Sequence, residues 1–475
     1  MSMGLPDLPI NGLLVAIVYA VAAGAVTVHV LLRKRSVRAA IGWIGLAWLS
    51  PVFGAALYYL FGINRVTRRA SRLRRADLFR VGAPRSGSER LLAENIAAMA
   101  GIVERLTGRE LADGNSISVL RSGDEAYPAM LSAIRNARRS IALASYIFRA
   151  DDAGRSFVAA LAEALSRGVE IRVLVDGIGG GYMFSPIVRR LRREGITVAR
   201  FLHHWLPWRM PYLNMRSHKK ILVVDGSIGF TGGINIGCEN VLARHPRNPV
   251  HDVHFRVDGP VVRHLMASFA DDWNFTTGET LEGDAWWPEI GPAGPALGRG
   301  ISSGPDEAVR HLESVLAAAV SAATRRLRIV TPYFLPDERL MSEIELAALR
   351  GVAVDLVLPE RSDNILLDWA MRAHIEAVAP DVRIYLTPRS FDHAKLMTLD
   401  GQWCLVGSAN WDVRSTRLNF EFSLECYNEA AAGEIDRMID LRMEKARRLS
   451  SEELATRPLP FRLRDAAARL LLPYL

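Results

Sequence analysis

The stretch HKKILVVD at residues 218–225 fits the pattern H-x-K-x4-D, and HAKLMTLD at residues 393–400 repeats it. In both copies, six residues separate the aspartate from a run of the form Gly-[Gly/Ser]-x-Asn, at 232–235 and at 407–410. A single copy of so short a pattern arises easily by chance. Two copies with the same downstream spacing are far more specific, and they indicate a chain that carries two related half-sites.

Each histidine lies two residues before a lysine, at the start of an apolar run. The alternation of side chains along a strand places His218 and Lys220 on one face, and the same holds for His393 and Lys395. Two such strands brought together would surround one small space with two imidazoles and two ammonium groups. That set suits a phosphate diester, because one imidazole can attack phosphorus while the other protonates the leaving alcohol.

The asparagines that end the two downstream runs, Asn235 and Asn410, are candidates to hold the non-bridging phosphate oxygens together with the lysines. A lone histidine in a strand is more often structural, but the paired spacing favours function for both histidines. The aspartates that end the motifs, Asp225 and Asp400, are each followed by glycine. Asp-Gly is ordinary turn chemistry, so a catalytic and a structural role both stay open for these two residues.

With these motifs, the chain resembles the phospholipase D superfamily and, within it, the bacterial cardiolipin synthases. Further runs that match the family are Tyr146–Phe148 with Asp152 and Gly154, 232–237, 303–306, 331–334, Arg414-Ser415, and 419–421. The resemblance implies a covalent phosphohistidine intermediate, with His218 as the nucleophile and His393 as the acid and then the base. It also implies catalysis without a metal or any other cofactor.

Members of the superfamily place a carboxylate behind each catalytic histidine, where it binds the far ring nitrogen. Glu421 matches that position in the second half, although alone it also fits a solvated strand residue, and Asp252 is the candidate in the first half. The chain departs from the family at His251, where arginine is usual, and at Cys238, where aspartate is common. The three cysteines have no metal-binding spacing.

The two halves align beyond the motifs, because each reads as a strand, a helix and a second strand before its histidine. Strands that alternate with helical patterns predict βαβ units and mostly parallel sheets. We therefore expect an α/β protein with two pseudo-symmetric phospholipase D-like half-domains, at 110–290 and 300–450, and a C-terminal tail at 451–475. Proline and glycine residues at 292–298 mark the linker. The end of the tail alternates basic and apolar residues, which fits either a membrane surface or a helix packed on the domain.

The halves differ in the path that leads to each histidine, which is 20 residues long from Val198 and 11 residues long from Val382. The extra residues fall in 201–212, where two tryptophans, one tyrosine and one phenylalanine stand beside Arg209. Such a composition suits a membrane interface, and a loop packed on the domain is the alternative.

Two runs near the N-terminus, Ile10–Leu32 and Ile41–Ile63, contain no charged residue. Each run of 23 residues would be about 35 Å long as a helix, which is enough to cross a bilayer. We expect residues 1–85 to form a membrane anchor built as a helix hairpin. Pro51 and Gly54 lie inside the second run and could make it kinked or re-entrant.

Charge is concentrated beside these apolar runs. Residues 1–85 hold twelve basic and two acidic residues, a net charge of +10, so residues 86–475 carry −2 of the chain's total of +8. A basic collar of this kind attracts anionic lipid headgroups. It fits poorly with nucleic-acid binding, for which basic residues should line the catalytic part. The larger basic cluster follows Ile63, which favours a cytoplasmic catalytic part anchored in the bacterial inner membrane.

Four functions fit this pattern to different degrees. A phosphatidyltransferase that makes cardiolipin from two phosphatidylglycerols and releases glycerol is favoured by the anchor and by both motifs. A phospholipase D that hydrolyses phospholipid to phosphatidic acid is the alternative, because only the acceptor differs. A nuclease of the same superfamily is disfavoured by the anchor and by the acidic balance of residues 86–475, and an inactive membrane scaffold by the completeness of both motifs. No pattern indicates an oligomeric state.

Overall fold

The computed structural model describes residues 10–33, 37–62, 92–203, 215–304, 311–376, 378 and 381–470. The chain divides into two compact units, residues 1–69 and residues 70–475. Most of the basic collar, most of the aromatic stretch at 201–212 and the last five residues lie outside the described residues. The predictions made for those segments therefore stay predictions.

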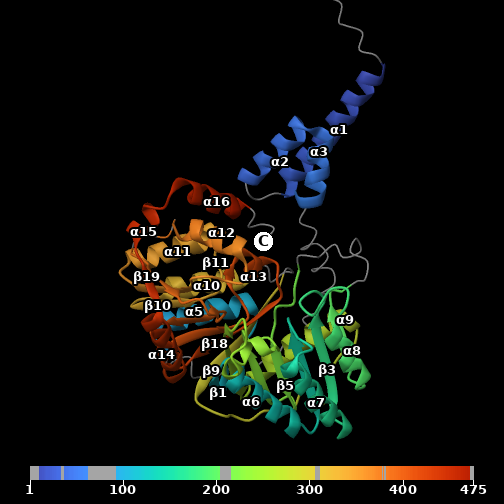
Figure 1. Ribbon diagram of the computed structural model, residues 1–475, viewed down its shortest axis with the longest axis vertical. Coiled ribbons are helices and arrows are strands. Elements are labelled where there is room, and N and C mark those ends of the chain that lie inside the picture. The colour runs from blue at the N-terminus through green and yellow to red at the C-terminus, as the bar shows by residue number, and fades with distance from the viewer. Residues whose placement is uncertain are drawn as a thin grey trace, which may run out of the picture. The chain divides into compact units, whose positions relative to one another are not determined.

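The N-terminal unit is helical, with α1 (Ile10–Arg33), α2 (Val37–Leu49), α3 (Pro51–Leu57) and a short π-helix, η1 (Tyr58–Gly62) (Figure 1). Within the described part of the chain, one helix is long and apolar enough to cross a membrane, at Leu14–Leu32 of α1. The second apolar run does not form one continuous span, because it breaks between α2 and α3. A kinked or re-entrant segment is the alternative that this break favours.

Pro51 and Gly54 explain the break in physical terms. Proline has no N–H to continue the hydrogen bonds of α2, and it is well tolerated in the first turn of the next helix. Gly54 then allows α3 to fold back on α2, since a Cβ at this position would collide with the backbone of Leu46 and Ala47. Polar contacts also hold the unit together: the Nδ1 atom of His29 lies 2.7 Å from the hydroxyl of Tyr58.

The second unit is built on a single 15-stranded sheet. Its order is β19-β13-β12-β10-β15-β16-β18-β9-β1-β8-β6-β5-β2-β3-β4. The first half contributes β1 (Ala112–Arg121), β2 (Ser140–Ser145), β3 (Glu170–Asp176), β4 (Val198–Phe201), β5 (Ile221–Val224), β6 (Ile228–Gly232) and β8 (Val253–Asp258). The second half contributes β9 (Ala296–Ser303), β10 (Arg326–Val330), β12 (Ala353–Pro359), β13 (Arg383–Thr387), β15 (Leu396–Leu399), β16 (Trp403–Gly407), β18 (Glu421–Tyr427) and β19 (Arg447–Leu449).

This order repeats itself outward from the centre, where β1 and β9 pair antiparallel. From β1 the strands run β8, β6, β5, β2, β3 and β4, and from β9 the equivalent strands run β18, β16, β15, β10, β12 and β13. The two half-domains therefore share one sheet with pseudo-two-fold symmetry. β19 is an additional strand at the edge of the second half.

The predicted α/β class is confirmed, and the sheet is mixed. Parallel pairing is found among β2, β3 and β4 and among β10, β12 and β13. The prediction of mostly parallel sheets thus describes only the βαβ part of each half. The strand after each histidine returns antiparallel and is joined to the next strand by a short Asp-Gly turn, which needs no helical crossover.

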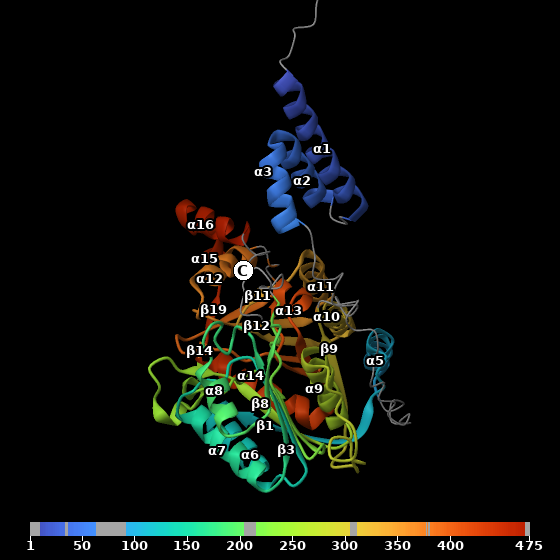
Figure 2. The same cartoon turned by 90° about the vertical axis from the view of Figure 1, so that its right-hand side faces the viewer.

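Helices cover both faces of the sheet. In the first half these are α6 (Ser122–Asn136), α7 (Asp152–Ser166), α8 (Pro186–Arg193) and α9 (Val262–Thr277). In the second half they are α10 (His311–Ala322), α11 (Glu338–Leu349), α12 (Ile365–Ile375), α13 (Val413–Arg417), α14 (Glu429–Lys445), α15 (Ser451–Ala455) and α16 (Leu459–Leu470), and α5 (Glu94–Thr107) precedes β1. One apolar core lies between α6–α8 and the first-half strands. Figure 2 shows α6 and α7 on the other side of these strands from α9.

The second core contains side chains from α5, α10, α11, α12 and the second-half strands. The C-terminal helix α16 packs against α12, with Asp465 and Ala468 buried, while Leu463 and Leu470 are exposed. Of the two alternatives for the tail, packing on the domain therefore holds for α16, and one side of the helix keeps exposed apolar side chains.

Candidate active site

Short backbone pairings between the halves bring the two histidines together. Ser217, just before His218, bridges to Phe420 of the second half, and the N–H of His218 donates to the carbonyl of Phe420 at 2.9 Å. In the equivalent place, β14 (Phe391–Asp392) pairs with β7 (Val250–His251), and the N–H of His393 donates to the carbonyl of His251 at 2.7 Å. Each histidine segment thus runs beside the segment that precedes a carboxylate of the other half.

The two predicted carboxylates consequently hold the histidines crosswise. Nδ1 of His218 lies 3.0 Å from Oε2 of Glu421, and Nδ1 of His393 lies 2.7 Å from Oδ2 of Asp252. A carboxylate on Nδ1 fixes the ring and the tautomer, and it leaves Nε2 available for chemistry. The centroids of the two imidazoles are 6.4 Å apart. The structure therefore places one oriented imidazole from each half at a single site.

The Gly-[Gly/Ser]-x-Asn runs fit the lengths of these carboxylates. In the second half, Ser408 donates from its hydroxyl to Oε2 of Glu421 at 2.5 Å, and Asn419 donates to Oε1 at 3.2 Å. In the first half the equivalent residue is Gly233, and a Cβ there would collide with the carboxylate of Asp252. The variable position of the run is thus a serine where it binds the carboxylate and a glycine where the carboxylate fills its space.

Both lysines of the motifs are buried beside the imidazoles. The Nζ atom of Lys220 donates to the carbonyl of His218 at 2.8 Å, and that of Lys395 donates to the carbonyl of His393 and lies 2.9 Å from its Nδ1. Burial lowers the pKa of Lys220 to about 7, with the charge of Lys395 as the next cause. Burial also lowers the pKa of Lys395 to about 8. A bound phosphate would place negative charge beside both ammonium groups and so favour their charged forms.

Burial also favours the neutral form of both imidazoles. It lowers the pKa of His218 to about 4, against the opposing effect of Glu421. The pKa of His393 is lowered as well, chiefly by burial and then by the charge of Lys395. A neutral imidazole has the free lone pair that a nucleophile needs.

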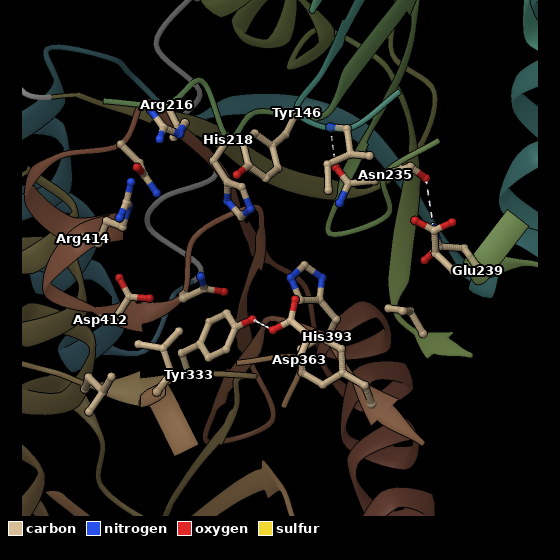
Figure 3. A pocket seen from close by; sticks show the side chains of 18 of the residues that line it. Tyr146, Arg216, His218, Asn235, Glu239, Tyr333, Asp363, His393, Asp412 and Arg414 are labelled. Atoms are coloured by element: carbon tan, nitrogen blue, oxygen red, sulfur yellow. Dashed lines mark hydrogen bonds between the residues drawn. The ribbon is translucent and has the colours of Figure 1, made fainter. Parts of the chain in front are cut away.

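Both histidines face one cavity of about 420 Å³ (Figure 3). The predicted phosphate-binding residues Asn235 and Asn410 line it too. Oδ1 of Asn235 accepts from the N–H of Ile147 at 3.1 Å, which leaves its amide N–H groups as donors. The ring of Tyr146 packs edge-on against His218 with the centroids 4.9 Å apart, and Phe391 lies 5.4 Å from His393.

The cavity also contains charged residues that sequence reasoning did not assign to the site. They are Arg149, Arg216, Glu239, Asp363, Asp412 and Arg414. The sequence did hold a signal for two of them, since Arg216 stands two residues before His218 and Arg414 four residues after Asn410.

Asp225 and Asp400 lie outside the described lining of the cavity. The carboxylate of Asp225 accepts from the N–H groups of residues 138–140, just before and at the start of β2. Asp400 does the same for residues 324–326 at the start of β10. Both residues have positive φ, 51° and 53°, as in a tight turn. These contacts favour the structural alternative that the sequence left open.

The fold and the site together define an enzyme of the phospholipase D type, in which two similar halves give one histidine each to one cavity. A family model described as "Cardiolipin synthase, PLD-like domain" matches residues 130–273 and 316–442. Cardiolipin synthase A of Pseudomonas fluorescens (strain SBW25) is 33% identical over 459 residues, which cover 94% of this chain and 95% of that protein. The major cardiolipin synthase of Bacillus subtilis (strain 168) is 30% identical over 465 residues, with coverages of 93% and 95%.

The chain therefore belongs to the cardiolipin synthase family, and it is a phosphatidyltransferase of the phospholipase D superfamily. The predicted resemblance is confirmed. Among solved structures, phosphatidylserine synthase of Haemophilus influenzae Rd KW20 shares the fold with a TM-score of 0.62 at 15% identity. That likeness covers 79% of this chain and 100% of the solved chain.

Proposed function

We propose that this chain transfers a phosphatidyl group from one phosphatidylglycerol to a second one, giving cardiolipin and releasing glycerol. The observation that carries the proposal is the pair of imidazoles on one cavity, 6.4 Å apart and each held at Nδ1 by a carboxylate. Opposed imidazoles at this spacing suit an in-line displacement at a phosphorus atom that sits between them.

In the first step, Nε2 of His218 attacks the phosphorus of the donor phosphatidylglycerol. The bond from phosphorus to the oxygen of the headgroup glycerol breaks. His393, protonated for this step, gives its proton to the departing oxygen, so that free glycerol leaves. The products on the enzyme are a phosphatidyl group bound to His218 and a neutral His393. The neutral state of His218, with its pKa lowered by burial to about 4, supports its role as the nucleophile.

In the second step, a hydroxyl of the second phosphatidylglycerol gives its proton to His393. Its oxygen bonds to phosphorus, and the bond from phosphorus to nitrogen breaks, which returns the lone pair to His218. Lys220, Lys395, Asn235 and Asn410 stabilise the charge that develops on the phosphate oxygens in both steps. Asp252 and Glu421 orient the rings, and Asp225 and Asp400 fix the ends of the strands that follow the two histidines.

The membrane is the natural location of such a reaction, because both substrates are lipids. The apolar helix α1 supports an anchor in the bacterial inner membrane, and the net charge of +10 over residues 1–85 supports attraction to anionic lipid. We propose a cytoplasmic catalytic unit on the basis of the basic cluster after Ile63.

The decisive test uses full-length protein in detergent with labelled phosphatidylglycerol, and it separates cardiolipin from phosphatidic acid. Cardiolipin with one glycerol released per product is expected. Phosphatidic acid as the main product would instead support hydrolysis. His218→Ala provides the inactive reference for both products.

A further inference from the structure

The side of the cavity where alcohols react is built by the second half. In the proposed reaction, His393 gives its proton to the leaving glycerol and later takes one from the attacking hydroxyl, so both alcohols lie beside His393. The ring of Phe391 packs against His393 with the centroids 5.4 Å apart, and the ring of Tyr333 lies 6.2 Å from that of Phe391. Tyr333 also lines the cavity. It is therefore a polar residue on the side where the alcohols react.

Tyr333 is joined to an acidic residue on this side. Its hydroxyl donates to Oδ1 of Asp363, which lines the cavity too (Figure 3). The two residues meet because β10 and β12 are parallel neighbours, so the segments that follow these strands leave the sheet at the same edge. Burial lowers the pKa of Lys395, and the charge of Asp363 is among the causes that oppose this shift. The carboxylate is thus near enough to the motif lysine of the second half to act on its charge.

The Asp363 carboxylate is held in place and keeps one oxygen for a ligand. Ser362 donates from its N–H to Oδ1 of Asp368 at 3.0 Å, and the side chain of Asn364 caps the first turn of α12. The backbone is therefore fixed on both sides of Asp363. Among the described residues, the hydroxyl of Tyr333 is the one hydrogen-bond donor to this carboxylate, and it contacts Oδ1. The other oxygen, Oδ2, can accept from a hydroxyl that enters the cavity.

The first half has a different composition at the equivalent places. Ile147 corresponds to Tyr333, and it lines the cavity with an apolar side chain. Each of these two carbonyls accepts from the hydroxyl two residues earlier, at 2.7 Å from Ser145 and at 3.0 Å from Thr331. The loop after β3, residues 177–185, contains no acidic residue, and none of these described residues lines the cavity. The pair of a tyrosine and an aspartate is thus specific to the half whose histidine exchanges protons with the alcohols.

We propose that Asp363 and Tyr333 form a subsite for the central hydroxyl of the glycerol headgroup. The inference rests on the proposed function and names the residues that choose this headgroup. The central hydroxyl is the neighbour of the reacting oxygen both in the glycerol that leaves and in the phosphatidylglycerol that attacks, so one subsite serves both steps. Oδ2 of Asp363 accepts a charge-assisted hydrogen bond from this hydroxyl, which positions the neighbouring oxygen at His393. Water and simple alcohols have no second hydroxyl and gain no such bond.

The test compares two acceptors that differ in one hydroxyl. Full-length protein in detergent receives phosphatidylglycerol with equal concentrations of glycerol and of trimethylene glycol, which lacks the central hydroxyl. The two acceptors carry different labels, and the assay follows the label that each adds to lipid. Both products need the same first step, so their ratio reports on the acceptor alone. The wild-type protein is expected to prefer glycerol, and Asp363→Ala should lower this preference at least about tenfold. Tyr333→Phe should lower it less, because the carboxylate remains.

Matched controls separate the subsite from other roles of the carboxylate. Glu360→Ala removes an acidic residue of the same loop that is not among the described residues lining the cavity, and it should keep the wild-type ratio. Propylene glycol, which keeps a hydroxyl beside the reacting one, should be used like glycerol. An equal fall for both acceptors in Asp363→Ala would show that the carboxylate acts through Lys395, and it would overturn the subsite. A preference for ethanolamine over glycerol that disappears in Asp363→Ala would show a site for a cation and would overturn the assignment to a hydroxyl.

The subsite and the proposed function fail in different ways. An unchanged ratio in Asp363→Ala, with cardiolipin still formed, would overturn the subsite and leave the proposed function standing. Wild-type protein with no preference for glycerol would overturn the subsite as well. Wild-type protein that makes phosphatidic acid in place of cardiolipin would overturn the proposed function, and a ratio that still depended on Asp363 would then support the subsite alone. Asp363 is exposed, and thermal melts check that its replacement leaves the protein folded.

Discussion

The two halves of the catalytic unit use the same scaffold to hold two histidines in different ways. His218 is held by Glu421, whose carboxylate is itself fixed by Ser408 and Asn419. His393 is held by the shorter Asp252, with Lys395 close to the same ring nitrogen. The repeated fold thus fixes where the imidazoles lie, while the residues around each imidazole differ, as the roles proposed for them, nucleophile and acid and base, require.

The largest effects are expected at the histidines. His218→Ala and His393→Ala should each lower turnover of phosphatidylglycerol by about 10³-fold or more, because each ring takes part in both chemical steps. The double variant should be little worse than either single one, as for residues that act as a unit. Steady-state rates of cardiolipin formation check this, and more than about a tenth of wild-type activity in either single variant would refute a shared site.

A substrate with a better leaving group turns this test into a comparison of the halves. A p-nitrophenyl phosphodiester needs little help from an acid, so His393→Ala should keep much of the wild-type rate for the first-turnover release of nitrophenol, whereas His218→Ala should not. The opposite pattern would exchange the roles of the two halves. Equal loss in both would show that neither histidine is a dedicated acid.

The carboxylates come next, and here the crosswise contacts make a sharp prediction. Glu421→Gln should slow formation of the covalent intermediate by about 10²-fold, because an amide no longer fixes the tautomer of His218. Asp252→Asn should act on proton transfer through His393, so its loss should be largest with glycerol as leaving group and small with nitrophenol. Rapid-quench measurements of labelled enzyme separate the two steps. Ser408→Ala, which leaves the carboxylate in place, is the milder control.

Much of this site could be predicted from sequence, because duplication is visible in a linear chain. The two His-Lys pairs, Asn235 and Asn410 follow from the repeated spacing. The crosswise contacts could not be predicted in this way, because no local periodicity connects their partners. One contact joins residues that are 203 positions apart in the sequence, and the other joins residues that are 141 positions apart. Arg216 and Arg414 escaped assignment for the same reason, because their place in one cavity depends on the packing of the two halves.

The fold was predictable to a similar depth. Alternating strands and helices correctly indicated βαβ units. They did not indicate that the strand after each histidine pairs antiparallel, because that pairing depends on the Asp-Gly turns and on the neighbouring strand. In the N-terminal unit, the absence of charge suggested a second span. The break at Pro51 shows that a single residue without an N–H can outweigh an apolar composition.

The pH dependence should follow the buried groups of the free enzyme. The ratio kcat/KM should fall as pH decreases through about 4, where His218 becomes protonated and loses its nucleophilic lone pair. It should also fall as pH rises, because His393, whose pKa is lowered by burial, loses the proton that it would give to the leaving oxygen. A further fall is expected through about pH 7, where Lys220 loses the charge that we propose stabilises the phosphate. Far into either limb, each further pH unit should cost about tenfold. A flat profile between pH 4 and 9 would contradict these assignments.

The last comparison is between Lys219 and Lys220, two neighbouring lysines whose substitution should change the stability of the protein in opposite directions. Lys219 is buried and lies 2.9 Å from buried Asp272, and the equivalent residue in the second half is Ala394. Lys219→Met should destabilise the protein by about 3–5 kcal/mol, because it leaves the carboxylate of Asp272 buried without its partner. Lys220→Met should instead raise the melting temperature near pH 7 while it abolishes activity, because it removes a buried charge that the fold holds at a cost.

The sign of the second effect follows from proton binding. The pKa of Lys220 is lowered from 10.5 to about 7 by folding. Between these two pH values the unfolded chain binds a proton that the folded chain does not, so stability rises with pH across this range. Lys220 therefore destabilises the fold fully below pH 7, and the lost stability is recovered as pH rises from about 7 to 10.5. The advantage of Lys220→Met in thermal melts should therefore shrink between pH 7 and pH 10. The matched control is Lys219→Met combined with Asp272→Leu, which removes both charges and should restore most of the lost stability. If Lys220→Met lowered the melting temperature as much as Lys219→Met, the two lysines would have the same structural role, and the buried charge of Lys220 would not destabilise the fold.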